Sequence, residues 1–224
     1  KYLVDVAHQE GAQYVAHGCS AKGNDQVRID VTVKLLDPKL KIVAPLREWE
    51  LTSRESEIDY AKKLKLPIKL TKEKIYSIDK NIWGVAIECG VLENLENEPP
   101  EDAFMLSRGI DKTPARPEYV SIDFVKGVPV ALNGKKMDFV SMLDSLNAIA
   151  GKHGVGRTDM IEDRVVGIKS REVYEAPAGW CLITAHRELE AAVLDRDTLA
   201  FKEMVSQKYA QLVYQGLWYS RLRE

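Results

Sequence analysis

Residues 16–28 read Ala-His-Gly-Cys-Ser-Ala-Lys-Gly-Asn-Asp-Gln-Val-Arg, and this stretch decides how the first part of the chain folds. The apolar run at 14–16 predicts the end of a buried strand, and the polar run at 24–26 predicts the start of a helix. Gly18 and Gly23 therefore lie in a strand-to-helix turn. Such a turn lets the backbone approach a ligand closely, and amide groups at the helix N-terminus attract an anion such as a carboxylate or phosphate.

Polar side chains in this turn extend the prediction. Lys22 supplies a positive charge, Ser20 a hydroxyl and Asp25 a carboxylate that can hold an ammonium group. The turn thus suits a zwitterion such as an amino acid. Glycine-rich turns also begin many helices that bind nothing, so the spacing alone leaves a purely structural interpretation open. The stretch lacks the spacing of a Walker A loop, and it does not decide by itself whether ATP binds.

Composition limits the class of protein. The chain has 224 residues, 45% of them hydrophobic, which is enough for one large domain or two small ones. Its 32 basic and 34 acidic residues give a formal net charge of −2, so nucleic acid is not an expected partner. No apolar run approaches the roughly 20 residues that span a bilayer, and we expect no membrane association.

Cysteine and histidine usage argues against disulfides and metals. Cys19, Cys89 and Cys181 lie far apart with no Cys-x-x-Cys pair, which favours free thiols in a reducing, cytoplasmic setting. His17 and His153 have no partners at metal-ligand spacing, so we expect both to be structural and expect no metal site.

Strands and helices alternate in the first 70 residues. A strand at 40–44 and a helix from Ser53 to Leu64 follow the opening turn and its helix. This alternation predicts a parallel α/β sheet. The chain starts inside a helical pattern at Lys1 and ends at Glu224 with no closing signal, so we expect the natural sequence to continue at both ends.

A change in composition near Leu70 predicts a domain boundary there. Residues 71–117 are rich in Asn, Asp, Glu and Pro, which predicts a linker and irregular loops. A β meander over 120–132 and the hairpin signal Asn133-Gly134 follow, then a helix capped by Asp138 and ended by Gly151. Beyond a turn at 151–157 we expect a strand pair over 159–168 that carries Glu162 to a cleft, then helices over 179–194 and 198–215.

Eight short motifs occur in order along the chain and carry a family resemblance. They are the stretch at 17–28, Ala-Pro-Leu-Arg-Glu-Trp at 44–49, Tyr-Ser-Ile-Asp-Lys-Asn-Ile-Trp-Gly at 76–84, Gly-Val-Leu-Glu at 90–93, Pro-Glu-Tyr at 117–119, His-Gly-Val-Gly-Arg at 153–157, Gly-Ile-Lys-Ser-Arg with Val-Tyr-Glu over 167–175, and Lys-Tyr-Ala-Gln-Leu-Val-Tyr at 208–214. Together they resemble argininosuccinate synthase over almost the whole chain.

The resemblance implies a fold and its division. It implies an α/β fold, in which residues 1–70 form the end of a parallel-sheet nucleotide-binding domain of the ATP-pyrophosphatase type. Residues 71–200 then form an α+β synthetase domain, and 201–224 start a C-terminal helical segment used in oligomerisation. The full-length enzyme is expected to be a cytoplasmic homo-oligomer, a tetramer.

The resemblance also implies an activity. It is the ATP-dependent ligation of citrulline and aspartate to argininosuccinate in arginine biosynthesis, with release of AMP and pyrophosphate and with Mg accompanying ATP. The ureido oxygen of citrulline attacks the α-phosphate to give a citrullyl-adenylate, and the aspartate amine then displaces AMP. Holding the reactants in place can contribute about 7 to 11 kcal/mol to such a reaction.

The resemblance also implies which residues form the site, position by position. The expected catalytic residues are Asp25, Asn24 and Arg28. The residues expected to bind aspartate are Ser20, Asn24 and Asp25. Those expected to bind citrulline are Asn24, Arg28, Ser77, Glu162 and Tyr174. Those expected to bind ATP are His17, Gly18 and Cys19. Judged without the resemblance, Arg28 and Glu162 are ordinary surface charges, Tyr174 a packing residue and Ser77 a cap. The aromatic residues from Tyr209 to Tyr219 suggest helix packing or a subunit contact.

Several positions depart from the family pattern. Val85 and Ala86 stand where a second serine for citrulline is usual, Asp163 replaces the usual Asn, and Glu172 replaces the usual Gly. The Ser-Gly-Gly loop that holds pyrophosphate in the family does not occur in this sequence. These departures leave two alternatives: a non-catalytic relative acting as a binding or assembly module, or another adenylating ligase of the same ATP-pyrophosphatase type.

Overall fold

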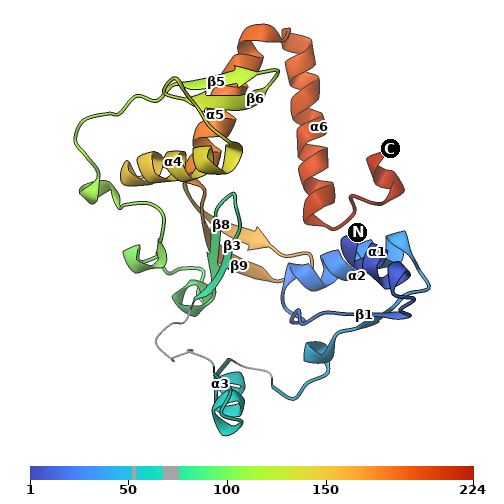
Figure 1. The fold of residues 1–224 in the computed structure, drawn as a ribbon. Coiled ribbons are helices and arrows are strands. Elements are labelled where there is room, and N and C mark those ends of the chain that lie inside the picture. The colour runs from blue at the N-terminus through green and yellow to red at the C-terminus, as the bar shows by residue number, and fades with distance from the viewer. Residues whose placement is uncertain (52–53, 68–75) are drawn as a thin grey trace. The chain divides into compact units, whose positions relative to one another are not determined.

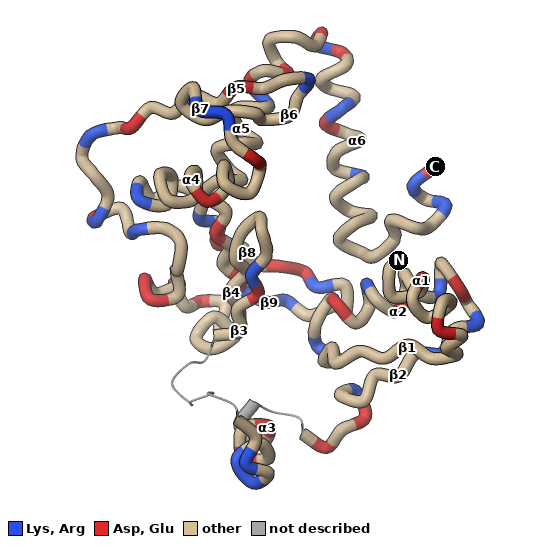
Figure 2. The backbone as a smooth tube through the Cα atoms, in the orientation of Figure 1, with Lys and Arg blue, Asp and Glu red and all other residues tan. Residues whose placement is uncertain are grey.

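The computed structural model describes residues 1–51, 54–67 and 76–224, and the chain forms two compact units (Figure 1). Unit 1 contains the described residues up to 67 together with Asp163–Ile168 and Ala200–Glu224. Unit 2 contains the described residues from 76 to Glu162 together with Lys169–Leu199. Figure 2 shows basic and acidic residues interspersed along the described chain.

Unit 1 confirms the predicted strand-helix-strand order. Its first elements are α1 (Tyr2–Gln9), β1 (Tyr14–Ala16), α2 (Asn24–Leu36), β2 (Lys41–Val43), the 3-10 helix η1 (Pro45–Arg47) and α3 (Arg54–Lys63). Strands β1 and β2 pair in parallel, with Val15 opposite Ile42. Helix α2 makes this possible because it carries the chain back to the end of the sheet at which β1 starts. The core of this sheet contains Val4, Val15 and Val33. The expected start of α3 at Ser53 lies outside the described residues.

Unit 2 contains a four-stranded sheet that sequence reasoning missed in part. Its order is β3 (Ser77–Lys80), β4 (Val85–Glu88), β9 (Lys169–Glu175) and β8 (Arg157–Asp163). The prediction of irregular structure over 71–117 is therefore wrong for 77–88. Strand β3 carries a single large apolar residue, Ile78, so its composition gives no period-two signal. The 3-10 helices η2 (Gly90–Glu93), η3 (Glu101–Ala103) and η4 (Ile110–Lys112) and the loops around them agree with the prediction.

The strand pair expected over 159–168 is also wrong. Strand β8 spans Arg157–Asp163, the chain turns through Gly167 at a φ of +83°, and the neighbouring strand β9 begins at Lys169. Strand β8 lies at the edge of its sheet and no residue in it is buried. An edge strand of this kind lacks the apolar alternation that would have marked its ends.

A second, three-stranded sheet confirms the predicted meander. It consists of β5 (Ile122–Val125), β6 (Val128–Leu132) and β7 (Lys135–Lys136), followed by α4 (Phe139–Lys152) and α5 (Pro177–Val193). Asn133 and Gly134 take φ values of 50° and 75°, the left-handed conformation that a tight hairpin turn requires. Asp138 caps α4 by accepting a 3.0 Å hydrogen bond from the Ser141 amide. Helix α6 (Arg196–Tyr214) and the 3-10 helix η5 (Arg221–Arg223) complete the chain.

Gly151 does not end α4, contrary to the prediction, because the helix continues to Lys152. The glycine serves packing instead. A Cβ atom built at this position would lie 2.1 Å from the carbonyl oxygen of Leu106, so only a residue without a side chain lets the loop pass this close.

We expect Gly151→Ala to lower the free energy of unfolding by about 1 to 3 kcal/mol, because overpacking costs more than the improved helix propensity returns. Urea denaturation measures the change. The exposed Asp144→Ala on the same helix is the control. A Gly151→Ala variant more stable than the control variant would contradict the packing role.

Candidate functional site in two groups of residues

The predicted site residues fall into two groups, one in each unit, and each group is described by itself. The turn between β1 and α2 in unit 1 holds the first. His17 has a side chain only 6% exposed, and its Nε2 lies 2.9 Å from Oδ1 of Asp30. Its Nδ1 accepts the Cys19 amide at 3.2 Å, so Nε2 carries the proton and donates it to Asp30. Arg47 holds the other oxygen of Asp30 at 2.8 Å. This network fixes the start of the turn.

Gly18 and Ser20 form the exposed part of the same turn. No atom lies within 4 Å of a Cβ built at Gly18, so the backbone there is open to an approaching group. Ser20 is exposed, whereas the backbone amide of Cys19 is directed to His17. Burial raises the pKa of the Cys19 thiol and the charge of Asp25 raises it further. The thiol form is favoured over the nucleophilic thiolate.

The first two turns of α2 carry the three residues expected to be catalytic, Asn24, Asp25 and Arg28. Gly23 is the N-cap residue and contributes no side chain. Asp25 is 66% exposed, and its Oδ1 accepts a 2.9 Å hydrogen bond from Nη1 of Arg28, one turn later. Asn24 is half-buried, and its Oδ1 accepts the Val165 amide at 2.8 Å. One face of these turns thus presents a carboxylate beside a guanidinium.

Tyr214, at the end of α6, positions two of these residues. Its hydroxyl accepts a 3.0 Å hydrogen bond from Nδ2 of Asn24 and donates one of 3.2 Å to the carbonyl of Asp163. Its carbonyl accepts Nε of Arg28 at 2.8 Å, and the guanidinium carbon lies 5.0 Å from the centre of its ring. Sequence reasoning took Tyr214 for a packing or subunit contact. Its place at the end of the 208–214 motif was the signal that could have found it.

We expect Tyr214→Phe to impair ligand binding more than folding. The phenylalanine ring still packs under Arg28, but Asn24 loses the acceptor that orients its amide, a loss of about 1 kcal/mol for a neutral hydrogen bond. The expected result is an increase of roughly fivefold in the KM of a substrate bound by Asn24, with the midpoint of thermal unfolding nearly unchanged. Tyr209→Phe, on the same helix, is the control, and equal effects of the two variants would contradict this role of Tyr214.

The second group lies on one face of the four-stranded sheet in unit 2. Tyr174 pairs with Ala86, and Ala86 pairs with Asp79, so their side chains share a face. Ser77, two residues before Asp79, lies on the same face, and the Tyr174 hydroxyl lies 3.2 Å from Oε1 of Glu162. The structure therefore brings Ser77, Glu162 and Tyr174 from three strands to one side of the sheet. The other side includes the fully buried Ile87 and Val173.

A buried carboxylate that sequence reasoning did not place in the site stands beside Tyr174. Glu172 is only 5% exposed. Its Oε2 lies 2.6 Å from the Tyr174 hydroxyl and its Oε1 accepts the Ser170 hydroxyl at 2.7 Å. Burial of the ring, followed by the hydrogen bond and charge of Glu172, holds the pKa of Tyr174 far above its usual value. The phenol is therefore protonated at every physiological pH.

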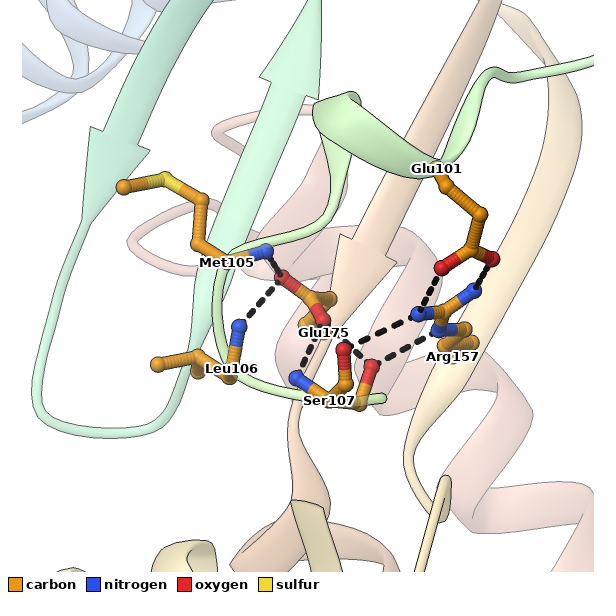
Figure 3. A network of polar contacts seen from close by, with 6 residues as sticks. All are labelled: Glu101, Met105, Leu106, Ser107, Arg157 and Glu175. Atoms are coloured by element: carbon orange, nitrogen blue, oxygen red, sulfur yellow. Dashed lines mark hydrogen bonds and ion pairs between the residues drawn. The ribbon is translucent and has the colours of Figure 1, made fainter. Parts of the chain in front are cut away.

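Glu175, on the opposite face of β9, fixes the loop that follows η3 (Figure 3). Its carboxylate is fully buried and accepts hydrogen bonds from the backbone amides of Met105, Leu106 and Ser107 at 2.6, 3.0 and 2.9 Å.

The Ser107 hydroxyl extends this network to Arg157. It donates a hydrogen bond to the Glu175 carboxylate at 2.5 Å and accepts one from Nε of Arg157 at 2.8 Å. Arg157 also pairs with Glu101 at 2.5 Å. This network supports the sheet whose other face carries Tyr174.

The remaining expectations concern thiols, histidines, metals and membranes. All three cysteines are free. Nε2 of His153 lies 3.0 Å from Oε2 of Glu118. Within the described ranges 1–51, 54–67 and 76–224, no three or more His, Cys, Asp or Glu side chains gather where they could hold a metal ion. Among the helices of this described part, none is both long and apolar enough to cross a membrane.

Two models of one protein family match this chain. Residues 1–67 match the family model of the arginosuccinate synthase N-terminal HUP domain, and residues 76–224 match that of the arginosuccinate synthase C-terminal domain. The chain belongs to the argininosuccinate synthase family. The resemblance found in the eight motifs is confirmed, and so is the α/β fold with a nucleotide-binding domain followed by a synthetase domain.

Curated members of the argininosuccinate synthase family match this chain from end to end. The argininosuccinate synthase of Thermoanaerobacter sp. (strain X514) is 56% identical over 223 residues, which cover 100% of this chain and 54% of that protein. That of Carboxydothermus hydrogenoformans is 55% identical over 224 residues, and that of Chlorobium limicola 54% identical over 224 residues, each alignment covering 56% of the relative. The chain thus spans about half the length of the curated relatives it matches.

Proposed function

We propose that the protein carrying this chain joins citrulline to aspartate and cleaves ATP to AMP and pyrophosphate. The observation that supports this most strongly is the sheet face of unit 2, where Ser77, Glu162 and Tyr174 come together from three strands. These are the residues that the family resemblance assigns to citrulline. Ser77 and Tyr174 lie far apart in the sequence, so no constraint between sequence neighbours explains the grouping.

The residues have complementary roles in this proposal. In unit 1, Asp25 holds the ammonium of aspartate and the turn at Ser20 holds a carboxylate of aspartate. Asn24 contributes to both amino-acid sites, and Arg28 suits the citrulline carboxylate because a guanidinium binds a carboxylate through two parallel hydrogen bonds.

In unit 2, Glu162 pairs with the citrulline ammonium, and Ser77 and Tyr174 supply hydroxyls. The open backbone at Gly18, flanked by His17 and Cys19, lies against the nucleotide.

Magnesium is proposed to arrive with ATP. Within the described part of the chain, no three or more His, Cys, Asp or Glu side chains gather where they could hold a metal ion by themselves. This supports an Mg²⁺ ion whose ligands are mainly the phosphates of ATP.

The assembly and location are proposals of the same kind. Large apolar side chains line one stripe of α6 and are exposed, which supports a homo-oligomer, a tetramer in the full-length enzyme. They are Phe201, Met204, Val205, Tyr209 and Val213. We also propose a cytoplasmic location and retain the divisions 1–70, 71–200 and 201–224 as the functional domains of the chain.

The test is product formation by the longest natural protein that contains this chain. Purified protein is incubated with Mg-ATP, citrulline and aspartate, and AMP, pyrophosphate and argininosuccinate are quantified. We expect AMP release that depends on citrulline, and argininosuccinate only when aspartate is also present. AMP release without citrulline would indicate another adenylating ligase, and no AMP under any condition would indicate a binding module.

A further inference from the structure

The Tyr174 hydroxyl has two carboxylate neighbours and only one proton to give. Glu172 Oε2 lies 2.6 Å from the hydroxyl oxygen and Glu162 Oε1 lies 3.2 Å from it. A phenol donates one hydrogen bond at a time and can accept others through its lone pairs. The shorter contact is in the range of a hydrogen bond from a hydroxyl to a charged oxygen, so the proton points to Glu172.

Burial and a second hydrogen bond fix the orientation of the Glu172 carboxylate toward Tyr174. Its carboxylate is buried, and the Ser170 hydroxyl donates to the oxygen that does not face Tyr174. Residues 170, 172 and 174 alternate along β9 and so lie on one face of the sheet. The raised pKa of Tyr174 agrees with a phenol that keeps its proton between the two carboxylates.

We propose that Glu172 is a positioning residue that sets the direction of the Tyr174 hydrogen bond, so that the hydroxyl presents an acceptor oxygen beside Glu162 to the substrate. This inference rests on the proposed citrulline site. A ligand ammonium or N–H group placed there can donate to both Glu162 and Tyr174. Without Glu172, the phenol would donate its proton to Glu162 and occupy the oxygen that the ligand needs.

The carboxylate of Glu172 also affects which ligand group can bind at this face of the sheet. Two carboxylates that share one phenol make the sheet face strongly acceptor-rich, and a donor-bearing or cationic group relieves this. A ligand carboxylate would meet the like charges of Glu162 and Glu172. The ligand end that this cluster takes is therefore the ammonium of an amino acid.

The test compares two substitutions of Glu172 with and without Tyr174. Glu172→Met keeps a side chain of similar length and removes the acceptor, so we expect the KM for citrulline to rise about tenfold, a typical result of losing a hydrogen bond to a charged group. Glu172→Gln retains an acceptor oxygen and is expected to restore most of the affinity. The kcat and the KM for aspartate are expected to change less than about threefold in either variant.

A double-mutant cycle decides whether Glu172 acts through Tyr174. In a Tyr174→Phe background, Glu172→Met is expected to have no further effect on the citrulline KM, because there is no hydroxyl left to orient. Asp123→Asn, an exposed carboxylate on β5 in the other sheet of unit 2, is the control for loss of one charge. Thermal unfolding of each variant identifies loss of folded protein.

The outcomes separate this inference from the proposed function. Additive effects of the two substitutions, or equal increases in the KM of all substrates, overturn the role of Glu172 while citrulline turnover by the unmutated protein upholds the proposed function. Absence of citrulline turnover and of calorimetric citrulline binding in the unmutated protein overturns both. Coupling between the two positions together with recovery in Glu172→Gln supports both.

Discussion

Replacing Glu175 by alanine is expected to lower the free energy of unfolding of unit 2 by about 3 to 5 kcal/mol, as when one partner of a buried charged network is removed. The carboxylate is fully buried and accepts three backbone amides and one hydroxyl from residues 105–107 (Figure 3). Alanine leaves these donors without their acceptor inside the protein, and each buried donor without a partner costs about 1 to 3 kcal/mol.

The measurement is urea denaturation followed by tryptophan fluorescence, since Trp83 and Trp180 both belong to unit 2. Glu101→Gln is the matched control, because it removes a carboxylate from the same network at an exposed position. We expect that variant to unfold close to the unmutated protein, as exposed ion pairs contribute little. Equal destabilisation by the two substitutions would show that the buried amide cluster does not anchor the loop.

The elements predicted from sequence are those with a clear period or cap. The helix after Gly23, the helix capped by Asp138 and the hairpin at Asn133 each carry a local signal, and each is confirmed within a few residues. Strands β3 and β8 carry no such signal, because β3 has one large apolar residue and β8 lies at a sheet edge. Tertiary pairing with β4 and β9 makes them strands, and one sequence does not display that pairing.

The site was predictable only as a set of positions. The family resemblance named Ser77, Glu162 and Tyr174, but their common face follows from the register of β3, β4 and β9 and from the contact between Tyr174 and Glu162. No spacing in the sequence reveals these pairings. Tyr214 and Glu175 act through partners that lie about 190 and 70 residues away, at Asn24 and at residues 105–107. Long-range contacts of this kind leave no local pattern to interpret.

Two positions that the sequence analysis interprets as departures from the family pattern lie beside Tyr174. Ala86 stands directly opposite Tyr174 in the ladder, and Glu172 lies two residues before it on the same face. The face thus lacks a hydroxyl at Ala86 and gains an acceptor at Glu172. Because both changes alter the hydrogen bonds available around one phenol, they are best understood together, and the effect of Ala86→Ser should depend on which residue occupies position 172.

Replacing Asp25 by asparagine is expected to reduce kcat/KM for aspartate by about one to two orders of magnitude, since a hydrogen bond to a charged group contributes about 1.5 to 3 kcal/mol. Asparagine keeps the shape of the side chain and removes the charge that would hold the aspartate ammonium. Asp25 is 66% exposed and its contact with Arg28 is an exposed ion pair, so the fold itself loses little. A large effect on turnover with an unchanged unfolding midpoint therefore points to ligand binding.

Asp37→Asn, which removes a carboxylate at the other end of α2, is the control and is expected to leave the aspartate KM unchanged. The partner of Asp37 is His8, and the hydrogen bond between them holds the pKa of Asp37 below its usual value. The charge of Asp37 therefore interacts with α1 and not with the turn at 16–28. An Asp25→Asn variant with unchanged KM for aspartate and unchanged kcat would remove Asp25 from the site. The turn at 16–28 would then be a structural strand-to-helix connection, the alternative that its glycine spacing left open.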